Sequence, residues 1–193
     1  LGLATPMSIM VATGKAATQG ILFRDAAAIE DLRRIDTLIV DKTGTLTEGR
    51  PAFERAVALQ GNSEDEILQV AASLDQGSEH PLADAIVRAA RERGMSLDKV
   101  EQFESASGIG VHGIVGGRRL ALGNVTLMAQ EGIALESSTE LARRAEALRQ
   151  SGASVIHLAR DGQLLGLLAV SDPVKASTPE ALASLRAAGL RVV

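Results

Sequence analysis

An aspartate directly after a short apolar run is the clearest chemical feature of the sequence. Residues 35–40, Ile-Asp-Thr-Leu-Ile-Val, predict a buried β-strand, and Asp41 follows it at once. Open α/β sheets bind ligands at the carboxyl ends of their strands, and a carboxylate placed there is a competent nucleophile toward a phosphoryl group. The position of Asp41 therefore indicates covalent chemistry on phosphate.

The loop that follows offers what phosphoryl transfer needs. Lys42 adds positive charge, and Gly44 lets backbone amides approach phosphate oxygens. Thr43, Thr45 and Thr47 offer hydroxyl and carbonyl oxygens for phosphate or Mg²⁺. An ordinary strand-to-turn junction would explain Asp-Lys-Thr-Gly alone. It does not explain the whole string Asp-Lys-Thr-Gly-Thr-Leu-Thr after an apolar strand.

This string resembles the phosphorylation motif of P-type ATPases, whose catalytic domain has the haloacid-dehalogenase-like fold. The resemblance implies that Asp41 accepts the γ-phosphoryl group of ATP, with Lys42 and Thr43 as further catalytic residues. It also implies that Asp41 and the Thr43 carbonyl bind Mg²⁺. Related phosphatases usually have a second aspartate, the general acid/base, where this chain has Thr43. Because a threonine cannot do this work near neutral pH, we expect a long-lived aspartyl phosphate.

A second cluster, Ser-Glu-His-Pro-Leu-Ala, lies where a helix over 82–93 is predicted to begin, a position that favours anions. An isolated histidine is usually a surface or core residue, which is our interpretation of His112 and His157. The cluster, however, resembles the nucleotide-domain signature of heavy-metal P-type ATPases. The resemblance implies that Glu79 and His80 belong to an ATP site, with His80 orienting ATP near the adenine.

Glycines extend this predicted site. The G-x-G-x-x-G string that begins at Gly108 would suit a dinucleotide-binding fold only if a helix followed, and here a strand is predicted. A plain β-turn is the other interpretation. In heavy-metal ATPases a Gly-x-Gly and a Gly-Asn pair lie against the nucleotide, which implies this role for Gly108, Gly110, Gly123 and Asn124. The family's adenine-contacting glutamate is Asp75 here, one methylene shorter, so we expect a weaker or water-mediated contact.

An Asp-Pro pair lies at residues 172–173, near the end of the chain. Such a pair is commonly just a turn. The resemblance implies instead that Asp172 and Pro173 form the hinge between the nucleotide and phosphorylation domains, with Lys175 as a polar hinge contact.

The predicted fold class is α/β, an incomplete haloacid-dehalogenase-like phosphorylation domain with an inserted α+β nucleotide-binding domain, an antiparallel sheet flanked by helices. Besides 35–40, strands are predicted over 52–59, 100–105, 110–115, 118–122, 155–160, 164–170 and from 190, and helices over 64–74, 82–93, 139–150 and 177–188. The predicted domains are 1–19 (end of a transmembrane helix and cytosolic extension), 20–50 (phosphorylation domain, first segment), 51–169 (nucleotide-binding domain) and 170–193 (phosphorylation domain, incomplete second segment).

Composition narrows the possible functions. Hydrophobic residues make up 46% of the 193 residues but aromatic residues only 2%, so the core must be aliphatic. A net charge of −4 argues against nucleic acid as a partner. The absence of cysteine excludes disulfides and thiolate metal sites.

The first residues raise the question of a membrane. Residues 1–12 are an uncharged apolar run that would span about 18 Å as a helix, against a hydrocarbon core of roughly 30 Å. The run is either a buried core helix or the end of a membrane helix. Residues 14–34, which mix charged with small apolar side chains, indicate a helix that leaves an apolar environment for water.

Two segments of the sequence indicate which ion is transported. Residues 1–6 resemble the sequence after the Cys-Pro-Cys motif of copper-exporting pumps, and residues 20–26 also resemble that branch. The resemblance implies a pump for Cu(I) or Ag(I) in the inner membrane, with this region on the cytoplasmic side and with the ion site outside this chain. It further implies ATP and Mg²⁺ as cofactors. The actuator and membrane domains of the same protein and a copper chaperone are implied as partners.

Three alternatives remain at this stage. They are a pump of the same class for Zn or Cd, a soluble haloacid-dehalogenase-like phosphatase, and a stand-alone nucleotide-binding module. A phosphatase predicts an aspartate at position 43 and no apolar start, and a stand-alone module would not need Asp41.

Overall fold

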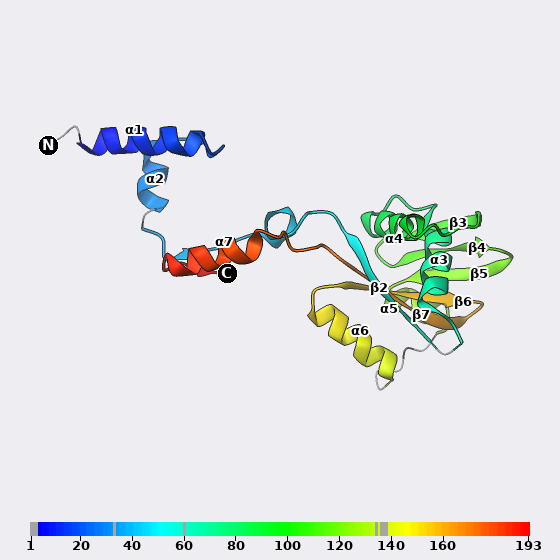
Figure 1. Ribbon diagram of the computed structural model, residues 1–193. Coiled ribbons are helices and arrows are strands. Elements are labelled where there is room, and N and C mark those ends of the chain that lie inside the picture. Colours follow the sequence, from blue (N-terminus) through cyan, green and yellow to red (C-terminus); the bar gives the residue numbers. More distant parts are fainter. Residues whose placement is uncertain (1–3, 33, 60, 134, 136–138) are drawn as a thin grey trace. The chain divides into compact units, whose positions relative to one another are not determined.

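The computed structural model describes residues 4–32, 34–59, 61–133, 135 and 139–193. The chain divides into two compact units, one comprising Leu1–Asp41 and Ala176–Val193, the other Lys42–Lys175. Figure 1 labels the helices of both units and the strands of the larger one, and the units are described separately below.

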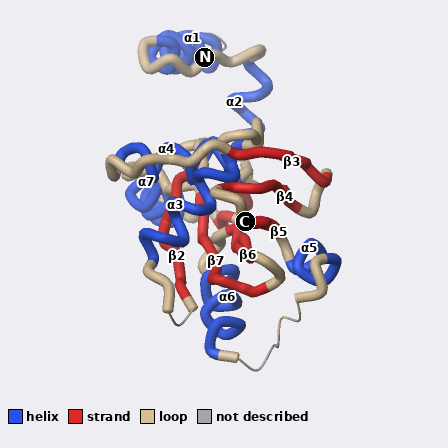
Figure 2. The backbone as a smooth tube through the Cα atoms, turned by 90° about the vertical axis from the view of Figure 1, so that its right-hand side faces the viewer, coloured by secondary structure: helices blue, strands red, loops and turns tan. Residues whose placement is uncertain are grey.

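A six-stranded antiparallel sheet forms the centre of the larger unit (Figure 2). Its strand order is β2-β7-β6-β5-β4-β3. The strands are β2 (Ala52–Ala58), β3 (Val100–Ala106), β4 (Gly110–Val115), β5 (Arg118–Gly123), β6 (Ser154–Arg160) and β7 (Gln163–Ser171). Gly116-Gly117 joins β4 to β5 and Asp161-Gly162 joins β6 to β7, and all four residues have positive φ. Two successive positive φ values match the twist of a hairpin, so both hairpin predictions are confirmed.

Helices cover both faces of this sheet. Alternate residues of a strand point to opposite faces, so Leu120 and Leu122 of β5 join a core with α3 (Glu64–Asp75) and α4 (Pro81–Glu92). Ala121 between them joins a second cluster with α5 (Val125–Gln130). Leu167 of β7 packs on this second side against α6 (Glu140–Gln150). The result is a helix–sheet–helix arrangement, as the fold-class prediction required.

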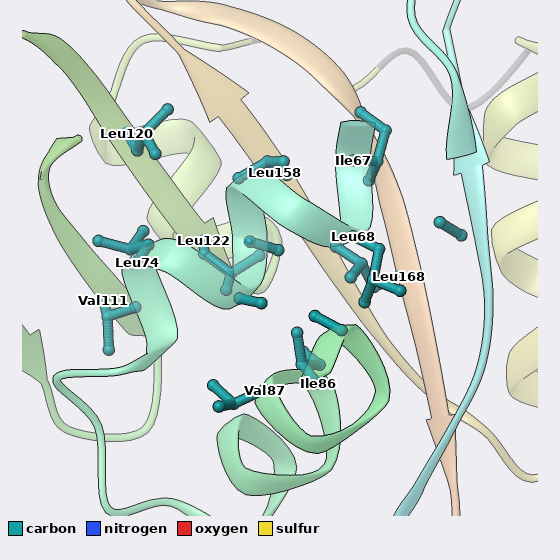
Figure 3. Packing of buried hydrophobic residues seen from close by; sticks show 14 of the residues in the cluster. Ile67, Leu68, Leu74, Ile86, Val87, Val111, Leu120, Leu122, Leu158 and Leu168 are labelled. Atoms are coloured by element: carbon teal, nitrogen blue, oxygen red, sulfur yellow. The ribbon is translucent and has the colours of Figure 1, made fainter. Parts of the chain in front are cut away.

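The main core is aliphatic. Figure 3 shows the side chains of α3 meeting those of α4 and of the central strands. Ile67, Leu68 and Leu74 of α3 and Ile86 of α4 have no exposed surface. The helix α3 begins at Ser63, whose Oγ accepts a hydrogen bond from the Glu66 amide at 3.1 Å.

The smaller unit contains α1 (Ala4–Ala17), α2 (Ala26–Leu32), β1 (Thr37–Leu38), α7 (Thr178–Ala187) and β8 (Arg191–Val192). The strands β1 and β8 pair in parallel, with Thr37 opposite Arg191. The Val40 amide extends the pairing by donating to the Val193 carbonyl at 2.9 Å. No helix in the described ranges is long and apolar enough to cross a bilayer.

Two predictions for this unit are wrong. A continuous helix over 14–34 is interrupted, because Gly20 takes φ 78° and the amides of Gly20 and Ile21 donate to the carbonyls of Ala17 and Ala16. This Schellman motif ends α1, and helix resumes only at Ala26.

The strand predicted over 35–40 is regular only at Thr37–Leu38 and is not buried, since Ile39 is 83% exposed. Its sheet has two strands, so little surface is covered. Of the N-terminal segment used for the ion prediction, residues 1–3 lie outside the described residues.

The buried core gives a stability prediction. Replacing Leu68 with Ala should lower the free energy of unfolding by about 2–5 kcal/mol, because a fully buried side chain is lost and a cavity remains. Urea unfolding followed by far-ultraviolet circular dichroism measures this change, since the chain has no Trp or Tyr. Leu22→Ala is the control, because Leu22 is 83% exposed. Equal shifts of the two midpoints would contradict the assignment of the core.

Candidate functional site

A cavity of about 440 Å³ opens in the larger unit, where α3 ends, α4 begins, and β3, β4, β5 and β6 come together. Six residues predicted for nucleotide binding line it: Asp75, His80, Gly108, Gly110, Gly123 and Asn124. The predicted residue Glu79 is exposed and is not among the described lining residues. The six residues come from three separated parts of the sequence, and the cavity brings them together.

His80 occupies the N-cap position of α4. Its Nδ1 accepts a hydrogen bond from the Leu82 amide at 3.1 Å, and Pro81 follows in the first turn, where its missing N–H costs nothing. An Nδ1 that accepts has no proton in the neutral ring, so the proton is on Nε2. The exposed His80 ring can therefore donate from Nε2 to a phosphate oxygen or a base nitrogen.

Asp75 is the last residue of α3 and lies at the wall of the cavity with 5% of its surface exposed. Among the described residues no hydrogen bond or ion pair reaches its carboxyl group. Burial without a cationic partner disfavours the charged form and raises the pKa of Asp75 to about 7. A neutral carboxyl group can donate as well as accept, which a carboxylate cannot do.

Gly110 and Gly123 are required by the close approach of two backbones. They face each other in the β4–β5 register. A Cβ on Gly110 would lie 2.3 Å from the Leu122 carbonyl oxygen, and a Cβ on Gly123 would lie 2.3 Å from the Ile109 carbonyl oxygen. Any side chain at either position would force the strands apart at the cavity wall.

The Asn124 side chain links the start of α5 to the glycine turn at Gly108 by hydrogen bonds. Its Oδ1 accepts from the amides of Thr126 at 2.9 Å and Leu127 at 3.2 Å, which caps α5. Its Nδ2 donates to the Gly108 carbonyl at 3.0 Å. The Asn124 side chain thus holds the glycine turn in place. Helix α5 has no recognisable signal in the sequence, because six residues are too few to show a helical period.

The loop that follows Asp41 turns sharply. Thr43 (φ −78°, ψ 123°) and Gly44 (φ 76°, ψ −14°) take the central angles of a type II turn, which needs glycine at its second central position. Asp41, Lys42 and Thr43 are exposed. Asp41 ends the first segment of the smaller unit, and Lys42 begins the larger one.

The three predicted hinge residues hold this loop. Asp172 Oδ2 accepts a hydrogen bond from Thr47 Oγ1 at 2.5 Å. The Pro173 carbonyl accepts from the Glu48 amide at 2.8 Å, and Lys175 Nζ donates to the Gly44 carbonyl at 2.8 Å. The expectation that Thr47 offers its hydroxyl to phosphate or Mg²⁺ is therefore wrong, because that residue is 2% exposed and its hydroxyl is bound to Asp172.

The remaining histidines have structural positions. His157 of β6 is 4% exposed, and burial lowers its pKa. His112 Nε2 lies 3.1 Å from Glu104 on the neighbouring strand. No cluster of three or more potential metal-binding His, Cys, Asp or Glu residues occurs in the part of the chain that the structure describes.

Sequence reasoning missed the serines of the cavity. Ser78, Ser105, Ser107 and Ser154 also line it, and their hydroxyl groups add polar contacts. They come from the ends of separate elements and share no spacing, so no sequence pattern could have identified them.

Comparisons with known proteins agree with this geometry. The haloacid dehalogenase-like hydrolase family matches residues 35–193. The chain is 49% identical over 193 residues to a silver exporting P-type ATPase of Salmonella typhimurium and to a copper-exporting P-type ATPase of Legionella pneumophila. All of this chain is covered in both cases, but only 23% and 26% of those proteins. The chain thus spans about a quarter of the length of these relatives.

Comparison with solved structures also matches the chain to ATPases. A zinc-transporting PIB-type ATPase in its E2.Pi state superposes with a TM-score of 0.82 and 32% identity, covering 98% of this chain and 30% of that one. The catalytic domain of a CPx-ATPase, described for conformational changes upon nucleotide binding, gives a TM-score of 0.67 and 25% identity, covering 93% and 61%.

The raised pKa of Asp75 predicts how stability depends on pH. In the unfolded chain this carboxyl loses its proton near pH 3.8, but in the folded chain only near 7. Folding therefore retains a proton between these values, and this group's contribution to stability is lost as pH rises through that window.

The substitution Asp75→Asn replaces the ionisable carboxyl group with an uncharged amide. The variant should gain stability over wild type as pH rises from 4 to 8, by at most about 4 kcal/mol. Urea midpoints of both proteins across this range measure the difference. Parallel curves would show that Asp75 ionises normally in the folded chain.

Proposed function

Since the chain belongs to the haloacid dehalogenase-like hydrolase family and matches a segment of copper- and silver-exporting P-type ATPases over its whole length, we propose that it is the ATP-binding and phosphorylation region of a pump that exports Cu(I) or Ag(I). The observation that carries the proposal is the meeting of six predicted nucleotide-site residues in one cavity. The reaction is transfer of the γ-phosphoryl group of ATP to Asp41.

The larger unit binds the nucleotide. Gly110 and Gly123 let β4 and β5 approach each other closely, which sets the shape of the cavity wall that a base would meet. His80 donates from Nε2, and Asp75 contacts a polar edge of the adenine. A cavity of about 440 Å³ holds the adenosine part of ATP, and Glu79 lies at its exposed edge.

Asp41 is the nucleophile. A carboxylate oxygen of Asp41 forms the bond to the γ-phosphorus as the bond to the β–γ bridging oxygen breaks, and ADP leaves. Lys42 supplies a positive charge beside the reacting oxygens. Because Thr43 replaces the general acid/base of related phosphatases, the aspartyl phosphate of this chain is not hydrolysed quickly by its own residues.

The residues present fit a magnesium ion. The Asp41 carboxylate and the Thr43 carbonyl are hard oxygen donors, which suit Mg²⁺ with water and phosphate oxygens as its other ligands. When bound, the ion neutralises charge on the phosphates. Two protein donors make an incomplete site, so further ligands come from other parts of the longer protein.

The domains follow the predicted boundaries in this proposal: 1–19, 20–50, 51–169 and 170–193. The hinge consists of Asp172, Pro173 and Lys175, which join the outgoing and returning segments at the base of the larger unit. The partners are the actuator and membrane domains of the same protein and a copper chaperone. The described region faces the cytoplasm from the inner membrane.

Sequence identity to known pumps supports copper or silver as the transported ion. The relatives named as copper or silver exporters are 49% identical, while the zinc-transporting structure is 32% identical. A pump for Zn or Cd is the alternative within this class. A soluble phosphatase is disfavoured by Thr43 and by the match of residues 1–34 to the pumps.

The chain itself should bind ATP without turning it over. Isothermal titration with ATP should show binding to the 193-residue chain, and His80→Ala should weaken it about tenfold, the loss expected when one hydrogen bond of about 1.4 kcal/mol is removed. His112→Gln is the matched control, because His112 is outside the described cavity lining. Equal loss in both variants, or acid-stable ³²P on the isolated chain, would contradict this part of the proposal.

The longer protein should hydrolyse ATP in response to the right metal. Cu(I) and Ag(I) should stimulate ATPase activity in membranes that contain it, and Asp41→Asn should abolish both the activity and the acid-stable phosphoprotein. Stimulation by Zn(II) but not by Cu(I) would overturn the ion assignment while leaving the catalytic mechanism intact.

A further inference from the structure

We propose that Phe103 positions His80 by packing its ring against Gly77, and that this contact sets the affinity of the chain for nucleotide. Phe103 is not among the described residues that line the cavity, so it acts through the loop 76–80 and not by touching the ligand. The inference rests on the proposed nucleotide function of the cavity.

The first observation is the closeness of the ring to Gly77. A Cβ built on Gly77 would lie 2.7 Å from Phe103 Cγ, 2.8 Å from Cδ2 and 3.1 Å from Cδ1. Three neighbouring ring atoms at these distances show that the ring lies directly against the Gly77 backbone. Real Cβ atoms essentially never approach carbon so closely, so only glycine allows both the ring and the loop to stay where they are.

A β-bulge brings Phe103 to this place. Glu101 pairs with Ile114 and Glu104 pairs with His112, so β3 advances three residues while β4 advances two. The extra residue lies between these pairs, where Gln102 takes the left-handed φ of 49°. As a result Val100 and Phe103, three residues apart, both pack against the main core, whereas a regular strand would point them to opposite faces.

A series of hydrogen bonds links the position of Gly77 to that of His80. The Gly77 amide donates to the Leu74 carbonyl at 3.4 Å, and the Ser78 amide donates to the Asp75 carbonyl at 2.9 Å. Ser78 Oγ then accepts from the His80 amide at 3.2 Å. A shift of Gly77 therefore moves the residue that holds the backbone of His80 at the start of α4.

The loop is also held on its other side. Gln76 Nε2 donates to the Asp98 carbonyl at 3.0 Å, in the segment that leads into β3. The loop between Asp75 and His80 is thus placed by two contacts with the β3 region, one polar at Gln76 and one apolar at Gly77. Because His80 makes its N-cap bond only in one ring orientation, a displaced loop misdirects Nε2 within the cavity.

The test compares four variants of the full chain by isothermal titration with ATP. Gly77→Ala should raise Kd about tenfold, because the added methyl group must push either the ring or the loop aside. Phe103→Ala should raise Kd less, since the loop is loosened and not displaced. The double variant Gly77→Ala/Phe103→Ala should bind more tightly than Gly77→Ala alone, because the smaller side chain leaves room for the methyl group.

Val100→Ala is the matched control. It removes an apolar side chain from the same strand and the same core face, but the three atoms nearest a Gly77 Cβ belong to Phe103 and not to Val100, so ATP affinity should remain that of wild type. Urea midpoints separate loss of fold from loss of affinity. The amide resonances of Ser78 and His80 should shift in Gly77→Ala and return toward wild type in the double variant, an effect that a general loss of stability would not produce.

The outcomes distinguish this inference from the function on which it rests. If wild type binds ATP and Gly77→Ala binds equally well, or if the double variant is no better than Gly77→Ala, the positioning role is wrong. If wild type does not bind ATP, the proposed function fails instead. The resonances of Ser78 and His80 then decide whether Phe103 positions the loop, since that measurement needs no ligand.

Discussion

The hydrogen bond between Thr47 and Asp172 closes the larger unit, and the rest of that unit depends on it. The two residues are 125 positions apart, and Asp172 also accepts from the Arg50 amide. Ala52 pairs with Ser171 directly beyond this contact, so the closure fixes the register of β2 on β7. The entropy cost of closing a loop grows only slowly with its length, so the polar contacts of Asp172 together with the pairing of β2 and β7 can hold so long an insertion.

The same closure shapes the loop after Asp41. Thr47 Oγ1 accepts from the Gly44 amide at 3.1 Å while donating to Asp172, and Lys175 Nζ binds the carbonyl of the same glycine. Both polar groups of Gly44 are thus bound by residues at the base of the insertion. The backbone after Asp41 is therefore held by Asp172 and Lys175, two residues of the proposed hinge, through contacts that do not involve the cavity.

Sequence patterns predicted the elements of the larger unit well, because two-residue periodicity and the turn residues Gly-Gly and Asp-Gly are local signals. They failed at two places for different reasons. Gly20 is a local helix-ending signal that the prediction of a continuous helix passed over, whereas the exposure of Ile39 depends on what covers its strand, which is not local. The predicted cavity residues came from a resemblance to a family, since nothing in their spacing shows that they meet. The bulge at Gln102, a residue type that carries no turn signal, could be found only in the structure.

The polar groups of the cavity divide into those that build it and those that can recognise a ligand. Asn124 uses both ends of its amide on the scaffold, so in the proposed function it acts on a nucleotide through the shape of the glycine turn. The serines of the wall, Asp75 and His80 remain, and the last two lie at the two ends of one short loop. At neutral pH a carboxyl group whose pKa is about 7 is protonated in a large fraction of molecules and can donate as well as accept. That additional donor offsets the shorter reach of aspartate, because a bridging water or a base nitrogen can accept from it. How well this cavity recognises a ligand then depends on the distance between the Asp75 and His80 side chains, which is set by the backbone of the loop between them.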